Sequence, residues 1–155
     1  MRVWRISRQS DTDNLSGVGG LYVSGRWHYR GHRILYTSAT PSLAVLEVLV
    51  HVDPALAPAG LRLLEIDVPD DIVIENCDPS TLTPNWQDYP FPAELQEYGS
   101  RWLDKCHTAI LSVPSAIIPI EKNYLINPEH TDTARLRIVA ERPFIYDPRL
   151  LTTKS

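Results

Sequence analysis

Proline is concentrated in the middle of this chain, and its distribution limits the fold more than any other feature. Seven of the 13 prolines fall between residues 54 and 92. Proline lacks a backbone N–H and fixes φ, so this segment cannot form one long helix. The segment instead predicts one or two strands joined by ordered loops.

Apolar periodicity predicts two helices around this segment. Thr40 is the expected N-cap of a helix that starts at Pro41 and ends before Pro54. A second, amphipathic helix is expected over residues 93–106. The expected strands are 2–6, 21–25, 33–37, 61–68, 72–75, 109–113, 115–120 and 136–140, with a polar loop over 10–20. Strands outnumber helices without regular alternation, which predicts an α+β fold in one compact domain over residues 1–155.

Charge and cysteine content argue against several classes of protein. The chain has 15 Lys plus Arg and 19 Asp plus Glu, a net charge of −4. This charge argues against a nucleic-acid-binding domain, because such domains are usually basic. Cys77 and Cys106 show no CxxC spacing, and the five histidines form no HExxH pair, so we expect neither a disulfide scaffold nor a metal site. No apolar run approaches the roughly 18 residues of a membrane helix, and the start resembles no secretory signal. The expected location is cytoplasmic, with no membrane contact.

Arginine is unevenly distributed along the chain. Residues 1–36 carry six arginines against two aspartates, a charge of +4, which leaves −8 for the remainder. This imbalance is compatible with an ordinary solvated surface. It is equally compatible with a pocket for an anionic ligand such as phosphate, because the guanidinium fork matches phosphate oxygens.

Glu47 is the only charged residue between Pro41 and Val52, in a predicted helix that is otherwise largely apolar. A carboxylate buried there without partners would cost several kcal/mol. Glu47 therefore belongs to a functional cleft, faces solvent, or pairs with His51 one turn later.

Two residues upstream are candidates for the same site. Arg26 follows Gly25, a glycine that allows close approach of the backbone to a ligand. Tyr36 ends a short apolar strand and fits either a core position or a site. Arg26, Tyr36 and Glu47 lie within 22 residues on strand, strand and helix, where one fold could bring them together. Downstream, Ser115 fits a turn or an exposed hydroxyl, without the Gly-x-Ser-x-Gly elbow of a hydrolase.

The order of several motifs resembles the RES domain, a family named for Arg, Glu and Ser signature residues. The resemblance runs from about residue 4 to residue 150 and rests on SGRW (24–27), ILYTS (34–38), LAVLEVL (43–49), VPSAI (113–117), NYLINPEH (123–130) and FIYDPRL (144–150). It implies a toxin of a bacterial toxin–antitoxin pair that inhibits growth, with a fold like the diphtheria-toxin type of ADP-ribosyltransferase. It also implies NAD⁺ as substrate without a resident cofactor, and a helix-turn-helix antitoxin of the Xre type that blocks the site.

The resemblance assigns roles to individual residues. It implies that Arg26, Tyr36 and Glu47 are catalytic. It places substrate binding at Ser115, Asn123, Trp27 and His28, with no metal ligand. His28 stands where many relatives have asparagine.

Three functions remain open at this point. One is an NAD⁺ glycohydrolase that cleaves the nicotinamide–ribose bond, and another is an ADP-ribosyltransferase that modifies a cellular protein. The third is a non-enzymatic module that binds an antitoxin; a nuclease is disfavoured by the acidic balance and the lack of a histidine pair. The sequence does not distinguish a monomer from a homodimer within an antitoxin complex. Aromatic residues at Trp86, Tyr89 and Phe91 suit either an interface or packing on their own core.

Overall fold

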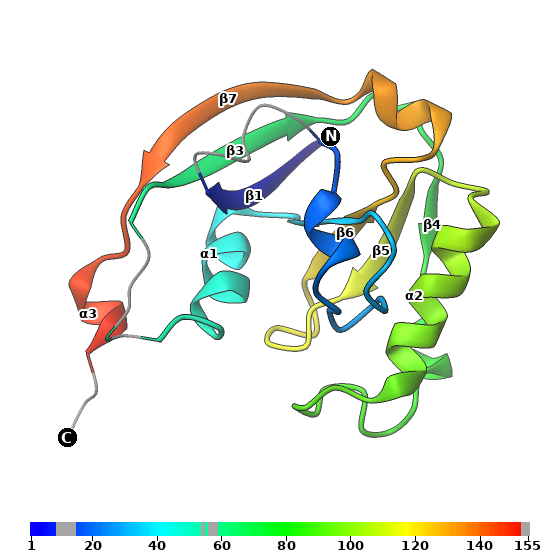
Figure 1. Ribbon diagram of the computed structural model, residues 1–155, viewed down its shortest axis with the longest axis horizontal. Helices are drawn as coiled ribbons and strands as arrows, with labels where there is room; N and C mark the ends of the chain where they lie inside the picture. The colour runs from blue at the N-terminus through cyan, green and yellow to red at the C-terminus, as the bar shows by residue number, and fades with distance from the viewer. Residues whose placement is uncertain (9–14, 54, 56–58, 153–155) are drawn as a thin grey trace.

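A mixed sheet organises the part of the chain that the computed structural model describes, which is residues 1–8, 15–53, 55 and 59–152. Within these residues seven strands follow the order β4-β5-β6-β2-β1-β3-β7 (Figure 1). They are β1 (Arg2–Arg8), β2 (Leu35–Ser38), β3 (Leu61–Asp67), β4 (Ile74–Asn76), β5 (Ile110–Pro114), β6 (Lys122–Ile126) and β7 (Arg137–Phe144). Neighbouring strands run antiparallel, except that β4 and β5 are parallel.

Helices lie at both halves of this sheet. They are α1 (Pro41–Leu49), α2 (Ala93–Lys105) and the short α3 (Pro148–Leu151), with 3-10 turns at Val18–Leu21, Pro79–Thr81 and Thr131–Arg135. The Thr40 hydroxyl accepts a hydrogen bond from the backbone N–H of Leu43 at 3.1 Å, which confirms the predicted N-cap. None of the described helices is long and apolar enough to span a membrane.

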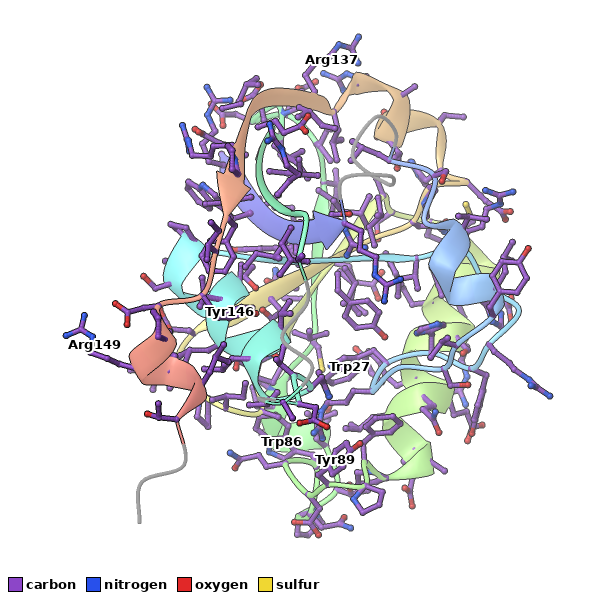
Figure 2. All side chains as sticks on the ribbon, turned by 60° about the vertical axis from the view of Figure 1, so that its left-hand side comes forward. Trp27, Trp86, Tyr89, Arg137, Tyr146 and Arg149 are labelled. Atoms are coloured by element: carbon purple, nitrogen blue, oxygen red, sulfur yellow. The ribbon has the colours of Figure 1, made fainter. Side chains whose placement is uncertain are left out.

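The two longer helices pack against opposite halves of the sheet (Figure 1). Ala44 of α1 packs with Ile6 of β1 and with Tyr146, which Figure 2 places beside α1. On the other half, Leu95 and Trp102 of α2 belong to a cluster with residues of β5 and β6. Fully burying one such leucine stabilises a fold by roughly 1.5–3 kcal/mol. Strand β2, the central strand of the sheet, therefore lies between the half that packs against α1 and the half that packs against α2.

The α+β prediction and the two longer helices are confirmed. The proline-rich segment is broken into β3, β4 and a 3-10 turn, as its prolines predict. The strands predicted over 33–37, 72–75 and 136–140 are present with shifted bounds. Residues 9–14, which include most of the polar part of the loop predicted over 10–20, lie outside the described residues.

Two strand predictions are wrong, and one strand was missed. Segment 21–25 continues from a 3-10 turn, because the backbone N–H groups of Tyr22 and Val23 both bond to the carbonyl of Gly19. Segment 115–120 forms a bend, because the Ser115 hydroxyl accepts hydrogen bonds from two nearby backbone N–H groups. The strand of this region is instead β6, which starts at Lys122.

Candidate active site

A cavity of about 790 Å³ opens between α1, strands β2 and β6, and the loop over 86–91. This volume lies within the range of about 300–1,000 Å³ that is usual for ligand pockets. Five of the seven residues predicted for the site line the cavity, namely Arg26, Trp27, Tyr36, Glu47 and Asn123. The fold thus brings together residues that are separated by almost one hundred positions in the sequence.

Glu47 is anchored in this cavity by two partners that are distant in sequence, one directly after β5 and one on β6. Its Oε1 atom accepts a hydrogen bond from the Ser115 hydroxyl and another from the Asn123 side-chain amide, both at 2.7 Å. Ser115 is fully buried, and its oxygen also accepts from the backbone N–H groups of Ile117 and Ile118 at 3.1 Å. Those two donors leave the Ser115 proton directed at Glu47, so the carboxylate has a fixed orientation. This arrangement differs from the local pairing with His51 considered above.

The Tyr36 hydroxyl is hydrogen-bonded to the buried ring of His28. The His28 Nε2 atom lies 2.9 Å from the carbonyl oxygen of Val23, which can only accept, so Nε2 carries the proton. Burial lowers the pKa of His28, and the neutral ring then accepts at Nδ1 from the Tyr36 hydroxyl at 2.7 Å. Burial also raises the pKa of Tyr36, which keeps that hydroxyl protonated. His28 is 3% exposed and does not line the cavity, so its ring positions Tyr36.

The environment of His28 predicts a pH-dependent loss of stability. Because its pKa is lowered in the fold, the unfolded chain takes up a proton first as the pH falls below about 6.5. The stabilisation is therefore fully present above that pH and is lost as the pH falls further. We expect His28→Asn to show a shallower decrease of Tm than wild type between pH 7.5 and pH 5. Equal slopes of Tm against pH in the two proteins would contradict this account of His28.

Gly25 and Trp27 complete the support of Tyr36. The backbone N–H of Trp27 donates to the Tyr36 hydroxyl at 3.2 Å. A Cβ on Gly25 would lie 2.5 Å from the same hydroxyl. The sequence predicted that the backbone at Gly25 approaches a ligand closely, and in the structure it approaches the Tyr36 side chain. The Trp27 ring is buried and meets Tyr98 edge to face at 6.0 Å. Trp27 is thus a core residue that also reaches the cavity wall.

Arg26 connects the cavity to the 86–91 loop. Its Nη1 atom donates to the carbonyl oxygens of Trp86 at 2.8 Å and Asp88 at 3.0 Å, and the guanidinium lies over the Phe91 ring at 5.5 Å. Burial lowers the pKa of Arg26. The Glu47 carboxylate has the largest opposing effect, because its negative charge favours the protonated guanidinium. An arginine nevertheless stays protonated in proteins. Both bonds use Nη1, and within the described part of the chain Nε and Nη2 make no hydrogen bond, so they can bind an anion.

Some cavity residues were missed from the sequence. Arg5 of β1 lines the cavity and donates from Nη1 to the carbonyl of Tyr36 at 3.0 Å. The arginine-rich start of the chain was the one signal that pointed to it. Tyr89 lines the cavity mouth, whereas Trp86 packs against the cluster that contains Trp27; Figure 2 labels all three residues in the lower part of the molecule. The aromatic loop thus serves both a core and a cavity wall.

Across the described ranges, no group of three or more His, Cys, Asp or Glu side chains is arranged to hold a metal ion.

A family model and several relatives of similar length match this chain. The family model of the RES domain matches residues 2–147. A protein of Pseudomonas putida named "Toxin Res" is 44% identical over 153 residues, which cover 97% of this chain and 99% of that protein. A protein of Sphingobium sp. named "Prs ADP-ribosylating toxin" is 37% identical, over 96% of this chain and 95% of its own length.

A solved structure has a similar fold. It is a chain of the M. tuberculosis MbcT–MbcA toxin–antitoxin complex, which superposes with a TM-score of 0.76 over 97% of this chain and 86% of that chain. At 20% sequence identity this similarity supports the fold alone. The motif order, the family match across nearly the whole chain and the full-length relatives agree, and the chain belongs to the RES domain family.

Proposed function

We propose that this protein is the toxin of a toxin–antitoxin pair and that it cleaves the nicotinamide–ribose bond of NAD⁺. The observation that carries the proposal is Glu47, whose carboxylate is fixed by Ser115 and Asn123 in a cavity that it shares with Arg26. The names of full-length relatives, which include "Toxin Res", support the toxin role. The resemblance of the fold to ADP-ribosyltransferases is part of the same proposal.

The proposed reaction needs a carboxylate more than it needs an acid. Cleavage of the bond to nicotinamide gives the ribose oxocarbenium character, as in glycoside hydrolysis. Nicotinamide leaves as a neutral ring from a cationic pyridinium, so its departure requires no proton. Water then adds to the ribose carbon and releases one proton, which gives ADP-ribose. A fixed negative charge beside the developing cation lowers the barrier.

The chain's own residues suit this reaction. Glu47 uses Oε1 for its two partners, and within the described residues Oε2 has no hydrogen bond, so Oε2 is the oxygen that would face the ribose. Arg26 would bind the pyrophosphate through its remaining donors. Tyr36 would stack against the nicotinamide ring. Rigid placement of the dinucleotide adds to the rate because the reacting atoms are already positioned.

A second candidate function is transfer of ADP-ribose to a protein. The relative named "Prs ADP-ribosylating toxin" favours it, because the similarity to this chain extends over nearly its whole length. The bond broken is the same, and only the acceptor differs: a protein side chain replaces water.

The partner is expected to be an antitoxin that covers the cavity. The solved complex of similar fold pairs a toxin with an antitoxin. In this chain Val23, Val50 and Tyr89 line the cavity and are 69%, 59% and 71% exposed. An apolar rim of this kind is typical of a surface that another protein covers. We propose an Xre-type helix-turn-helix protein as that partner.

The experiment that tests the function uses partner-free protein made by cell-free synthesis, because a bound antitoxin would hide activity. The protein is incubated with NAD⁺ labelled in the adenine half, with and without a cell extract. We expect free nicotinamide together with labelled ADP-ribose. Label on an extract protein would support transfer instead, and unchanged NAD⁺ in both reactions would contradict the enzyme and favour a non-enzymatic antitoxin-binding module.

A further inference from the structure

Ser38 lines the same cavity as Glu47, and within the described residues its hydrogen bond goes to Asn123 and not to the carboxylate. It is the last residue of β2, and the antiparallel register pairs it directly with Asn123 of β6. Residues in such cross-strand pairs have Cβ atoms about 4.5–5.5 Å apart, close enough for their side chains to bond. The Ser38 hydroxyl donates to Asn123 Oδ1 at 2.8 Å, and Ser38 is 3% exposed.

Hydrogen-bond chemistry fixes the direction of this chain of contacts. A carboxylate can only accept, so the Asn123 group that faces Glu47 Oε1 must be the NH₂. The Asn123 carbonyl oxygen then faces Ser38, and the hydroxyl there must be the donor. If the amide rotated by half a turn, its oxygen would face the carboxylate oxygen and repel it.

We propose that Ser38 is a positioning residue that holds the Asn123 amide in the orientation that donates to Glu47. Without the hydroxyl, Asn123 Oδ1 loses its donor in a buried site, and the flipped and unflipped amides become closer in energy. In the flipped state Glu47 keeps only the bond from Ser115. Its free oxygen then no longer has one fixed direction.

This inference rests on the proposed function, because the reaction is what makes the direction of Glu47 matter. Ser38 contributes to the ground-state arrangement of a group that acts in the transition state. Its removal is therefore expected to lower kcat and to leave KM for NAD⁺ nearly unchanged. A residue that only stabilised the fold would alter Tm without this split.

The test compares Ser38→Ala with Ser38→Thr, which keeps the hydroxyl. For Ser38→Ala we expect kcat to fall by about tenfold and KM to change by less than about threefold. Ser38→Thr is expected to retain most of the activity. Thr133→Val is the matched control, since it removes another buried hydroxyl, one that donates to the Asn127 carbonyl far from the cavity. Wild-type kcat in Ser38→Ala, or an equal loss in Ser38→Thr with its Tm retained, would overturn the proposal.

A double-mutant cycle identifies the route of the effect. If Ser38 acts through Asn123, then Ser38→Ala has no additional effect on kcat in an Asn123→Ala background. Independent, multiplicative losses would overturn the proposal.

The side-chain amide signals of Asn123 give a readout that does not depend on activity. They are assigned in the ¹H–¹⁵N spectrum by their loss in Asn123→Ala. They are expected to move in Ser38→Ala and to stay in place in Ser38→Thr. Unmoved signals in Ser38→Ala would overturn the positioning role even if NAD⁺ is consumed. If wild type consumes no NAD⁺ while these signals do move, the proposed function fails and the contact between Ser38 and Asn123 stands.

Discussion

Replacing Glu47 with glutamine is expected to lower kcat for NAD⁺ cleavage by on the order of 10³-fold while the protein remains folded. Glutamine has nearly the same shape, and its carbonyl oxygen can still accept from Ser115 and Asn123 at the position of Oε1. The network around the residue would survive, and the negative charge would be lost. The variant thus separates the charge of Glu47 from its structural role.

The measurement is the initial rate of nicotinamide release, with Tm as the check on folding. Glu141→Gln is a suitable control, because it neutralises a carboxylate on β7 that pairs with Arg62 at 2.9 Å, away from the cavity. The control is expected to keep wild-type kcat. Full activity in Glu47→Gln would remove Glu47 from the mechanism.

Among substitutions of the seven glycines by alanine, Gly99→Ala is expected to produce the largest loss of stability by steric overlap. Gly99 lies in α2, and a Cβ there would overlap the backbone carbonyl of Trp27. Backbone atoms cannot rotate away as a side chain can, so the helix and the Trp27 segment must separate. Overpacking of this kind costs about 1–3 kcal/mol and sometimes more. For a chain of this size we expect Tm to fall by roughly 5–10 °C.

Thermal unfolding followed by circular dichroism measures this effect. Gly19→Ala is the matched control, because a Cβ on Gly19 meets no atom within 4 Å and should change Tm little. Since Trp27 donates to the Tyr36 hydroxyl, Gly99→Ala should also weaken NAD⁺ turnover below its melting transition. A Tm equal to that of wild type would show that the contact between α2 and Trp27 is looser than described.

Local sequence signals predicted the elements whose cause is local. Thr40 and Pro41 mark the start of α1 because capping involves residues only three positions apart. The apolar spacing of α2 likewise reflects one helical face. Segment 115–120 was predicted wrongly because one buried hydroxyl, that of Ser115, captures the backbone N–H groups that a strand would use.

The site was predictable only in part, for a related reason. A single carboxylate among apolar residues made Glu47 a candidate site residue, and Arg26 and Tyr36 lie near it in sequence. Its bond partner Asn123 is 76 positions away, and Ser115 is 68 positions away, so only family resemblance indicated them. Ser38 could not be found without the register of β2 against β6, because a one-residue shift would turn its side chain to the other face.

The most direct test of the account is a crystal structure of Glu47→Gln with NAD⁺ bound, since this variant is expected to bind the dinucleotide without cleaving it. We expect intact NAD⁺ in the cavity, with the ribose that carries nicotinamide against the side chain at position 47 and the pyrophosphate at Arg26. NAD⁺ bound elsewhere, or bound here with its adenine end at position 47, would contradict it.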